Sequence, residues 1–433
     1  PLVVGLGEGE NFLGSDVAAF VAYTKRAMEV DQDQAVCVSA DKVIVTDFDG
    51  NVVENPKTYT VDWDASAAEK GGWDSFMDKE IHEDPAAVQR TLLGRFDANG
   101  GITLDEVRID EHDFKAIDKI IVVACGTASY AGQVAKYAIE HWVRIPVEIE
   151  LAHEFRYRDP ILTPRTLVVA ISQSGETMDT LMALRHAREQ GSKVLAICNT
   201  QGASIPRESD AVLYTHAGPE VAVASTKAFV AQITAAYLLG LYLAQVKGAM
   251  FRDEIHQVLD SLKDMPRKIQ WVLDTQPKTI QAAAERMVNA NSFLFLGRHV
   301  GYPVALEGAL KLKFTEGFAA GELKHGPIAL VDEGEPVVFI VPPQRGRNVL
   351  HAKVISGIEE VKARGAYIIA VAEQGDPDVE RYADVVFWRP ACPTLMSPLV
   401  DVVPLQLFAM DMAKLKGYDV DKPRNLAKSV TVE

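Results

Sequence analysis

Six consecutive residues, Ser172-Gln173-Ser174-Gly175-Glu176-Thr177, place four donor-bearing side chains around one glycine. They follow the apolar run 167–171 and precede a predicted helix. Ligands of open parallel sheets bind at the carboxyl ends of strands, and hydroxyl groups, backbone N–H groups and a helix N-terminus together suit an anion. We interpret this segment as a phosphate-binding loop. The alternative is a polar turn with an N-cap, but four such side chains in six residues are unusual for a simple turn. The loop lacks the lysine of a nucleotide P-loop and has no GxGxxG pattern, so neither a nucleotide nor a dinucleotide is expected.

A second candidate for chemistry is Lys428, which lies near the end of the sequence among Leu426, Ala427, Val430 and Val432. Apolar neighbours predict that this chain end docks into the protein. A lysine carried inward is costly unless it is paired or its amine is neutral, and a neutral amine can form a Schiff base with a carbonyl group. The tail alone favours the alternative, a structural segment whose lysine extends to the surface.

Other candidate residues are Glu307, Lys311 and Lys313 on a predicted helix, 303–314, and His325 before a Gly-Pro turn. Glu307 and Lys311 share a helix face, and their spacing alone favours a solvated ion pair. A histidine on a rigid loop suits proton transfer near neutral pH, although a hydrogen-bonding loop histidine is the simpler interpretation.

Two small-residue turns also precede predicted helices. The turn at Gly126-Thr127 and the turn at 223–227 are each equally consistent with substrate contact and with an ordinary turn or capped helix start.

From about residue 106 the sequence alternates between apolar strands and helices, and these elements must position the candidate residues named above. Continuous apolar runs of this kind are typical of strands buried on both faces. The plan recurs about 170 residues later, with the helix-ending Gly191 answered by Gly365. We predict an α/β fold with two tandem, doubly wound parallel sheets, joined by a helical stretch from about 228 to 290. The strands that carry this prediction are 120–124, 166–171 and 193–198, answered by 293–297, 336–341 and 367–371.

The first 65 residues form a different, β-rich pattern. Short apolar runs surround a hairpin turn at Asp49-Gly50, and a helix is expected from Val17 to Thr24. The next segment is polar, with two short helices starting near Phe76 and Pro85, and suits a linker. The expected division is 1–65, a β-rich remnant; 66–105, a linker; 106–255 and 256–420, the two α/β domains; and 421–433, the tail.

The composition of the chain limits the classes of molecule that it is expected to bind. The 433 residues carry a formal charge of −16, so nucleic acid and anionic membranes are poor partners. No run of eighteen apolar residues occurs, and four scattered cysteines indicate reduced thiols in the cytoplasm. No His/Cys/Asp/Glu cluster has metal-ligand spacing, so neither a metal nor another cofactor is expected.

Several motifs together resemble one family, the glucosamine-6-phosphate synthases or glutamine–fructose-6-phosphate aminotransferases (isomerising). The resemblance implies two sugar isomerase (SIS) domains, preceded here by the last part of a glutaminase domain. The motifs are Cys125-Gly126-Thr127, 172–177, 224–227, 305–313, 321–327 and the tail from Arg424.

The resemblance also implies residue roles. Lys428 would form the Schiff base, and His325, contributed by the partner subunit of a homodimer, would open the sugar ring. Lys311 would assist near the sugar, and Glu307 would be a supporting acid. The residues implied to bind the phosphate are Ser172, Gln173, Ser174 and Thr177, and those implied to line the sugar are Thr127, Val223 and Ala427.

The sequence departs from the family pattern in three places. The nucleophilic cysteine of the glutaminase domain has no match, so the polypeptide as written is not expected to hydrolyse glutamine. The segment after Lys313 is short and lacks a glutamate, the family's base for the C1-to-C2 proton transfer. Ala128 stands where many members have a serine.

The function implied is the amino-sugar synthesis step that converts fructose 6-phosphate and glutamine-derived ammonia to glucosamine 6-phosphate. Two alternatives remain open: an ammonia-dependent sugar-phosphate isomerase, and a non-catalytic SIS sensor of sugar phosphates.

Overall fold

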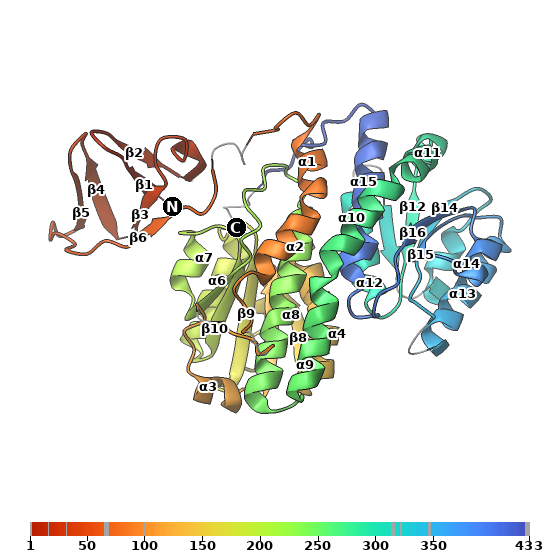
Figure 1. Ribbon diagram of the computed structural model, residues 1–433, viewed down its shortest axis with the longest axis horizontal. Coiled ribbons are helices and arrows are strands. Elements are labelled where there is room, and N and C mark those ends of the chain that lie inside the picture. The colour runs from red at the N-terminus through yellow and green to blue at the C-terminus, as the bar shows by residue number, and fades with distance from the viewer. Residues whose placement is uncertain are drawn as a thin grey trace.

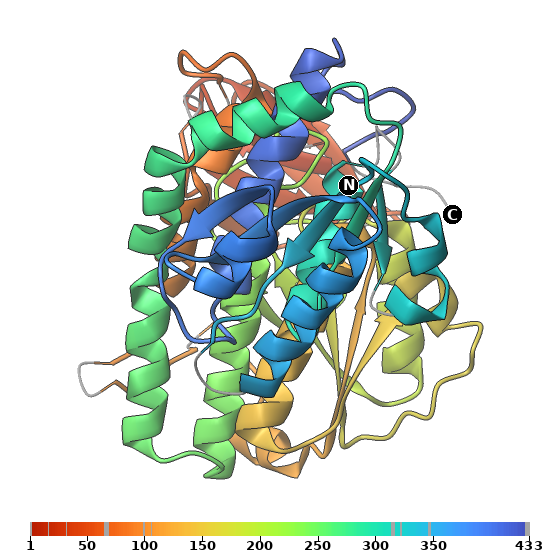
Figure 2. The ribbon, with the colours of Figure 1, turned by 90° about the vertical axis from the view of Figure 1, so that its right-hand side faces the viewer.

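The computed structural model describes residues 2–15, 17–31, 33–64, 69–97, 100–104, 106–312, 317–320, 323–344 and 348–428. These residues form a β module and two α/β domains that follow one another across the molecule (Figure 1). Viewed from the end, the second domain lies in front of the first (Figure 2).

The N-terminal β module contains a four-stranded antiparallel sheet, β2-β1-β3-β6, and the hairpin β4-β5. The predicted hairpin turn at Asp49-Gly50 is confirmed: Thr46 forms an antiparallel bridge with Val52, and the Asn51 N–H donates to Asp47 Oδ1 at 2.8 Å. The helix predicted from residue 17 to 24 is only a short 3-10 helix, Val17–Ala19, and Val17, Phe20 and Val21 lie in the small core of the module. The strands are β1 Leu2–Leu6, β2 Asn11–Gly14, β3 Arg26–Val30, β4 Gln34–Val38, β5 Val43–Asp47 and β6 Thr58–Thr60.

The first α/β domain has a parallel five-stranded sheet in the order β8-β7-β9-β10-β11. Gly191 ends the helix α6 with a positive φ of 83°, as its position predicts. The elements are α3 Glu111–Ala116, β7 Lys119–Ala124, α4 Gly126–Val143, β8 Val147–Leu151, α5 Ala152–Phe155, β9 Thr166–Ser172, α6 Met178–Glu189, β10 Lys193–Cys198, α7 Ser204–Glu208 and β11 Ala211–Tyr214.

The second α/β domain repeats that order as β13-β12-β14-β15-β16, again with parallel pairing. The predicted tandem doubly wound fold is therefore confirmed. Four helices lead into this domain: α8 Lys227–Lys247, α9 Arg252–Lys263, α10 Met265–Thr275 and α11 Pro277–Met287. Its own elements are β12 Phe293–Leu296, α12 Gly301–Lys311, β13 Gly317–Ala320, the 3-10 helices Leu323–His325 and Pro327–Leu330, β14 Pro336–Ile340, α13 Asn348–Lys362, β15 Tyr367–Glu373, α14 Pro377–Tyr382, β16 Val385–Arg389 and α15 Pro398–Leu415.

The apolar runs of the first sheet are buried because helices cover both of its faces. Ile120, Val122 and Ala124 of β7 belong to one core cluster with residues of α4 and α8, whereas Ile121 and Val123 belong to another with residues of α5 and α6. Alternate side chains of one strand thus enter opposite layers, which explains why the sequence shows no polar alternation there.

The segment from residue 66 to 105, interpreted from sequence as a linker, contributes to the main core. It contains the helices α1 Phe76–His82 and α2 Asp84–Leu92, the second with Pro85 in its first turn. Apolar residues of both helices, including Ile81 and Val88, belong to the largest core cluster, and α2 packs against α8 and α10.

Helix α8 is apolar around its whole circumference. It is the one helix among the described residues that is long and apolar enough to cross a membrane. However, 83% of its most apolar 18-residue stretch is buried inside the structure. A helix that is hydrophobic on every side is typical of the centre of a large core.

Polar contacts attach the β module to the first α/β domain. Arg207 on α7 donates to the carbonyl oxygen of Val30 at 2.7 Å, and His216 Nδ1 lies 2.8 Å from Asp62 Oδ2. The hydrogen bonds to Asp62 and Glu106 raise the pKa of His216 to about 9. The imidazolium form of His216 therefore joins Asp62, which follows the strands of the β module, to Glu106 and to its own α/β domain.

We expect the attachment of the β module to weaken as the pH rises through about 9. A histidine with a raised pKa stabilises the folded state fully below its ordinary pKa, about 6.5, and loses that contribution through the raised value. Hydrogen exchange of strands β1 and β3 between pH 6.5 and 9.5 measures the effect. In His216→Asn, whose asparagine tolerates the positive φ of 50° at this position, the pH-dependent part should disappear, whereas the exposed His112→Asn should retain it. Equal pH dependence in both variants would contradict this assignment.

Candidate functional site

A cavity of about 230 Å³ opens at the carboxyl ends of the strands of the first sheet. This is the edge at which parallel α/β sheets bind ligands. Segments distant in sequence contribute to its wall: the ends of β7 and β9, the turn before α8, the end of α12 and the tail. Most of the predicted site residues line it, namely Thr127, Ser172, Gln173, Ser174, Thr177, Val223, Lys311, Ala427 and Lys428.

The loop 172–177 is held in a tight turn that exposes donors to the cavity. The Gly175 N–H donates to Ser172 Oγ at 3.0 Å, and Ser172 Oγ lies 3.2 Å from Thr177 Oγ1. Glu176 fixes the loop from outside by accepting hydrogen bonds from the Ser204 N–H and hydroxyl groups at 2.7 and 2.8 Å. Thr177 occupies the N-cap position of α6 but makes no side-chain cap hydrogen bond.

Gly175 is required by this turn. Its φ is +69°, and a Cβ atom there would lie 2.6 Å from Ala203 Cβ and 2.9 Å from Cys198 Sγ. Any other residue would strain the backbone and force its neighbours apart.

Glu307 and Lys311 form a buried ion pair rather than a solvated one. Lys311 Nζ lies 2.6 Å from Glu307 Oε1, and the two side chains are 3% and 0% exposed. The surface pair that their spacing alone favours is therefore wrong, because α12 packs against α4 of the first domain. Thr127 completes the cluster: Lys311 Nζ donates to Thr127 Oγ1 at 2.9 Å, and that hydroxyl donates to Glu307 at 3.2 Å.

Burial raises the pKa of Glu307 above its ordinary value, although the charge of Lys311 and the two hydrogen bonds oppose the shift. The cluster thus presents one ammonium group to the cavity, supported from behind by an enclosed carboxyl group.

Lys428 also lines the cavity and forms an ion pair. Its Nζ donates to Glu220 Oε2 at 2.5 Å and to the carbonyl oxygen of Ala222 at 2.7 Å, and its side chain is 23% exposed. The lysine is therefore partly buried with its charge paired, whereas the sequence of the tail alone favoured a lysine that extends to the surface. Neighbouring Leu426 lines the cavity and is 57% exposed, so it is less enclosed than expected, whereas Val430 and Val432 lie outside the described residues.

Glu220 is the residue of the site that sequence reasoning missed. Its Oε1 accepts the N–H groups of Thr226 and Ala228 at 2.9 and 3.0 Å, so a distant carboxylate, and not the Thr226 side chain, caps α8. Burial acts to raise the pKa of Glu220, but the Lys428 charge and these hydrogen bonds outweigh it and hold the pKa below its ordinary value. A glutamate seven residues before a helix belongs to no recognisable sequence motif. Only its contact with Lys428 in the structure identifies Glu220 as a site residue.

The remaining predicted residues are not brought to this cavity within one chain. His325 ends the 3-10 helix Leu323–His325, is exposed and does not line the cavity. Lys313 lies outside the described residues.

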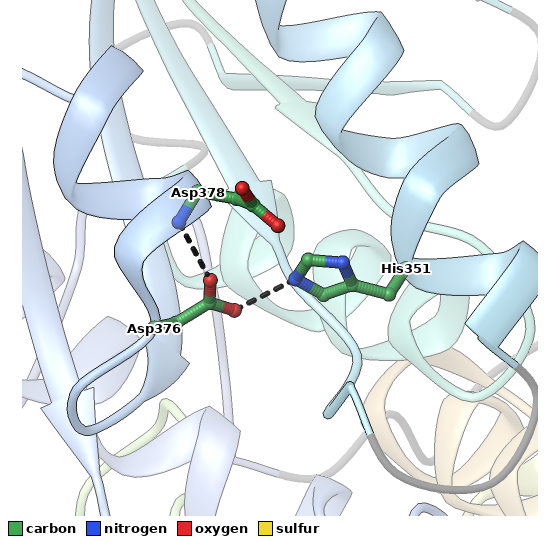
Figure 3. Close-up of side chains that lie close together, drawn as sticks. All are labelled: His351, Asp376 and Asp378. Atoms are coloured by element: carbon green, nitrogen blue, oxygen red, sulfur yellow. Dashed lines mark hydrogen bonds and ion pairs between the residues drawn. The ribbon is translucent and has the colours of Figure 1, made fainter.

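The corresponding edge of the second sheet carries a different group. His351 Nε2 lies 2.7 Å from Asp376 Oδ2, and Asp378 lies beside them, so three metal-ligand side chains converge that their sequence spacing did not reveal (Figure 3). Asp376 Oδ1 already accepts the N–H groups of Asp378 and Val379 at the start of α14. The group is explained as a helix cap braced by a histidine from α13.

Comparison with known proteins agrees with this architecture. The SIS domain model matches residues 114–242 and 286–416. A glutamine–fructose-6-phosphate aminotransferase (isomerizing) of Corynebacterium diphtheriae is 66% identical over the whole chain, which spans 70% of that relative, and the one of Streptomyces coelicolor is 62% identical over the whole chain and 71% of the relative.

Among solved structures, the C-terminal domain of glucosamine-fructose-6-phosphate aminotransferase from Francisella tularensis is 38% identical with a TM-score of 0.76. It covers 82% of this chain and 100% of its own. A putative phosphosugar isomerase from Silicibacter pomeroyi, 25% identical with a TM-score of 0.64, covers 80% and 100%. The chain has two SIS domains with parallel sheets, and a polar loop and a paired lysine line one cavity of the first. Since its relatives also match it along its full length, this chain belongs to the glutamine–fructose-6-phosphate aminotransferase (isomerizing) family.

Proposed function

We propose that this protein converts fructose 6-phosphate and glutamine-derived ammonia to glucosamine 6-phosphate at the cavity of the first sheet. The observation that carries the proposal is that Lys428 and the loop 172–177, whose hydroxyl and amide groups suit a phosphate, line the same cavity. The phosphate of the sugar would bind Ser172, Gln173, Ser174 and Thr177, and the sugar chain would extend past Thr127, Val223 and Ala427 towards Lys428.

Lys428 is the proposed nucleophile. Its Nζ attacks the C2 carbonyl of the open-chain ketose, water leaves, and the resulting iminium ion is an electron sink. Because Lys428 is paired with Glu220 at 2.5 Å, the amine must first lose a proton, and Glu220 is in hydrogen-bond contact to accept it. Ammonia then displaces Lys428, and proton transfer from C1 to C2 gives the aldose.

Lys311 is proposed to act on the oxygen atoms of the sugar, with Glu307 as its supporting acid. Lys311 is a donor at the cavity wall whose charge Glu307 and Thr127 hold in place. Ring opening is assigned to His325 of a second subunit, since the histidine of the same chain is exposed and does not line the cavity. A cytoplasmic homodimer and a division into a β-rich remnant, two α/β domains and a catalytic tail are part of this proposal.

The test uses the full-length protein with fructose 6-phosphate. Formation of glucosamine 6-phosphate with ammonia and with glutamine, together with a borohydride-trapped adduct located at Lys428, is the expected result. Activity with ammonia alone would favour the ammonia-dependent isomerase. Sugar-phosphate binding without product or adduct would favour the sensor and overturn the proposal.

Replacing Ser172 by alanine is expected to weaken fructose 6-phosphate binding by about ten- to a hundredfold, with a smaller change in kcat. A hydrogen bond to a charged group contributes about 1.5–3 kcal/mol, and the lost hydroxyl also supports the Gly175 N–H. KM and inorganic phosphate competition measure the effect. Ser209→Ala is the control, because Ser209 does not line the cavity. An unchanged KM in Ser172→Ala would contradict phosphate binding by this loop.

A further inference from the structure

Helix α1 contacts the two segments that converge on Lys428. One is the segment 220–223 before α8, which holds Glu220 and the carbonyl acceptor of Lys428. The other is the tail after α15, which crosses over α1 to return to the first domain (Figure 1). Two carboxyl groups make these contacts, Glu80 and Asp421.

Glu80 holds the segment 220–223 through its backbone. Its carboxyl group is buried, and its Oε1 accepts the N–H groups of Val221 and Ala222 at 2.5 and 3.3 Å. The carbonyl oxygen of Ala222 in turn accepts a hydrogen bond from Lys428 Nζ at 2.7 Å. A shift of this segment would therefore move both acceptors of Lys428, the Ala222 carbonyl and Glu220.

Asp421 holds the tail against the same helix. Its two carboxylate oxygens accept the N–H groups of Phe76 and Met77 at 3.0 and 2.9 Å. Its own carbonyl oxygen accepts the Val223 N–H at 3.0 Å. The tail, helix α1 and the segment 220–223, which holds both acceptors of Lys428, are thus joined to one another by hydrogen bonds.

We propose that Glu80 and Asp421 are positioning residues that use helix α1 to hold Lys428 at its reactive place. The proposal rests on the proposed role of Lys428 as the Schiff-base residue. It gives a catalytic reason for a helix whose sequence suggested only a linker between two domains.

Glu80 can perform this role as a neutral acid. The charged groups around it are Glu83, Asp84, Glu220, Lys227 and Lys428. Burial, and then the charge of Glu220, raise the pKa of Glu80 to about 8. Its Oε2 has no hydrogen-bond partner among the described residues. A glutamine at this position would keep the acceptor for both N–H groups, whereas an alanine would remove it.

The experiment compares Glu80→Gln, Glu80→Ala and Asp421→Ala in the full-length protein, with the exposed Glu111→Ala as a matched control. The readouts are the rate of borohydride trapping with fructose 6-phosphate, kcat and KM. We expect both alanine variants to lose about a hundredfold in trapping rate and kcat, the scale of a misplacement of about 1 Å, with a much smaller change in KM. Glu80→Gln and Glu111→Ala should stay near the wild-type rate.

The pH profile separates positioning from a purely structural effect. Above about pH 8, ionised Glu80 adds a second negative charge near the Lys428 ammonium and helps it to keep its proton. The trapping rate of the wild type should therefore rise less steeply than that of Glu80→Gln over this range. Glu80→Asp, which shortens the reach by one methylene group, serves if the alanine variant does not fold.

Wild-type trapping rates in a folded Glu80→Ala or Glu80→Asp variant, or in Asp421→Ala, would overturn the inference and leave the proposed function intact. Absence of trapping at Lys428 in the wild type would instead overturn the proposed function.

Discussion

Lys428→Arg is expected to abolish synthesis of glucosamine 6-phosphate, by on the order of 10⁴-fold or more. An arginine can keep the ion pair with Glu220 at this place, but its guanidinium group stays charged and cannot form a Schiff base. The measurement is kcat with ammonia as the nitrogen donor, combined with mass spectrometry after borohydride treatment in the presence of fructose 6-phosphate.

Lys422→Arg is the matched control, since Lys422 is an exposed lysine of the same tail. It should retain both activity and the adduct. Binding of the sugar phosphate should survive in Lys428→Arg, because the loop 172–177 is unchanged. An active Lys428→Arg enzyme would remove the covalent step from the mechanism.

Lys311→Met is expected to destabilise the folded protein by about 3–5 kcal/mol. Glu307 is completely buried, and Lys311 is its cationic partner at 2.6 Å. Without that ammonium group, Oε1 of the carboxyl group keeps the Thr127 hydroxyl as its hydrogen-bond donor, while Oε2 has no partner among the described residues. Denaturant unfolding followed by fluorescence measures the loss as a lower midpoint.

The double variant Glu307→Gln/Lys311→Met should recover much of that stability, because it no longer buries an unpaired charge. It should nevertheless remain poorly active, since the donor at the cavity wall is gone. The exposed pair Glu111 and Lys115 gives the control: Lys115→Met should change stability by less than about 1 kcal/mol. Equal unfolding midpoints for Lys311→Met and Lys115→Met would contradict the burial described here.

Much of the fold could be predicted because it depends on local patterns. The apolar run at 120–124 has no polar alternation, since helices cover both faces of its strand. Gly191 and Gly365 mark corresponding helix ends because both have positive φ values, 83° and 85°. The repeat follows from such signals, and the structure bears it out with the same strand order in both sheets.

The linker interpretation shows where local patterns fail. Residues 76–92 are polar enough to suggest a surface connection, yet their apolar side chains belong to the largest core cluster, which the two α/β domains share. The residues of a segment are enough to predict that it is a helix. Whether that helix connects two domains or forms part of the core depends on the other helices against which it packs.

By itself, the sequence determined the kinds of chemistry available: a loop of hydroxyl and amide side chains after a buried strand, a lysine in an apolar tail and a tandem α/β framework. Only the tertiary structure decided which groups meet. It buried Glu307 with Lys311 against Thr127, although spacing alone favoured a surface pair, and it placed Glu220 2.5 Å from Lys428 across 208 positions of sequence. The physical reason is that strand and helix formation follow periodicity within a few turns, whereas the charge state and reactivity of a side chain follow from neighbours that folding alone brings together.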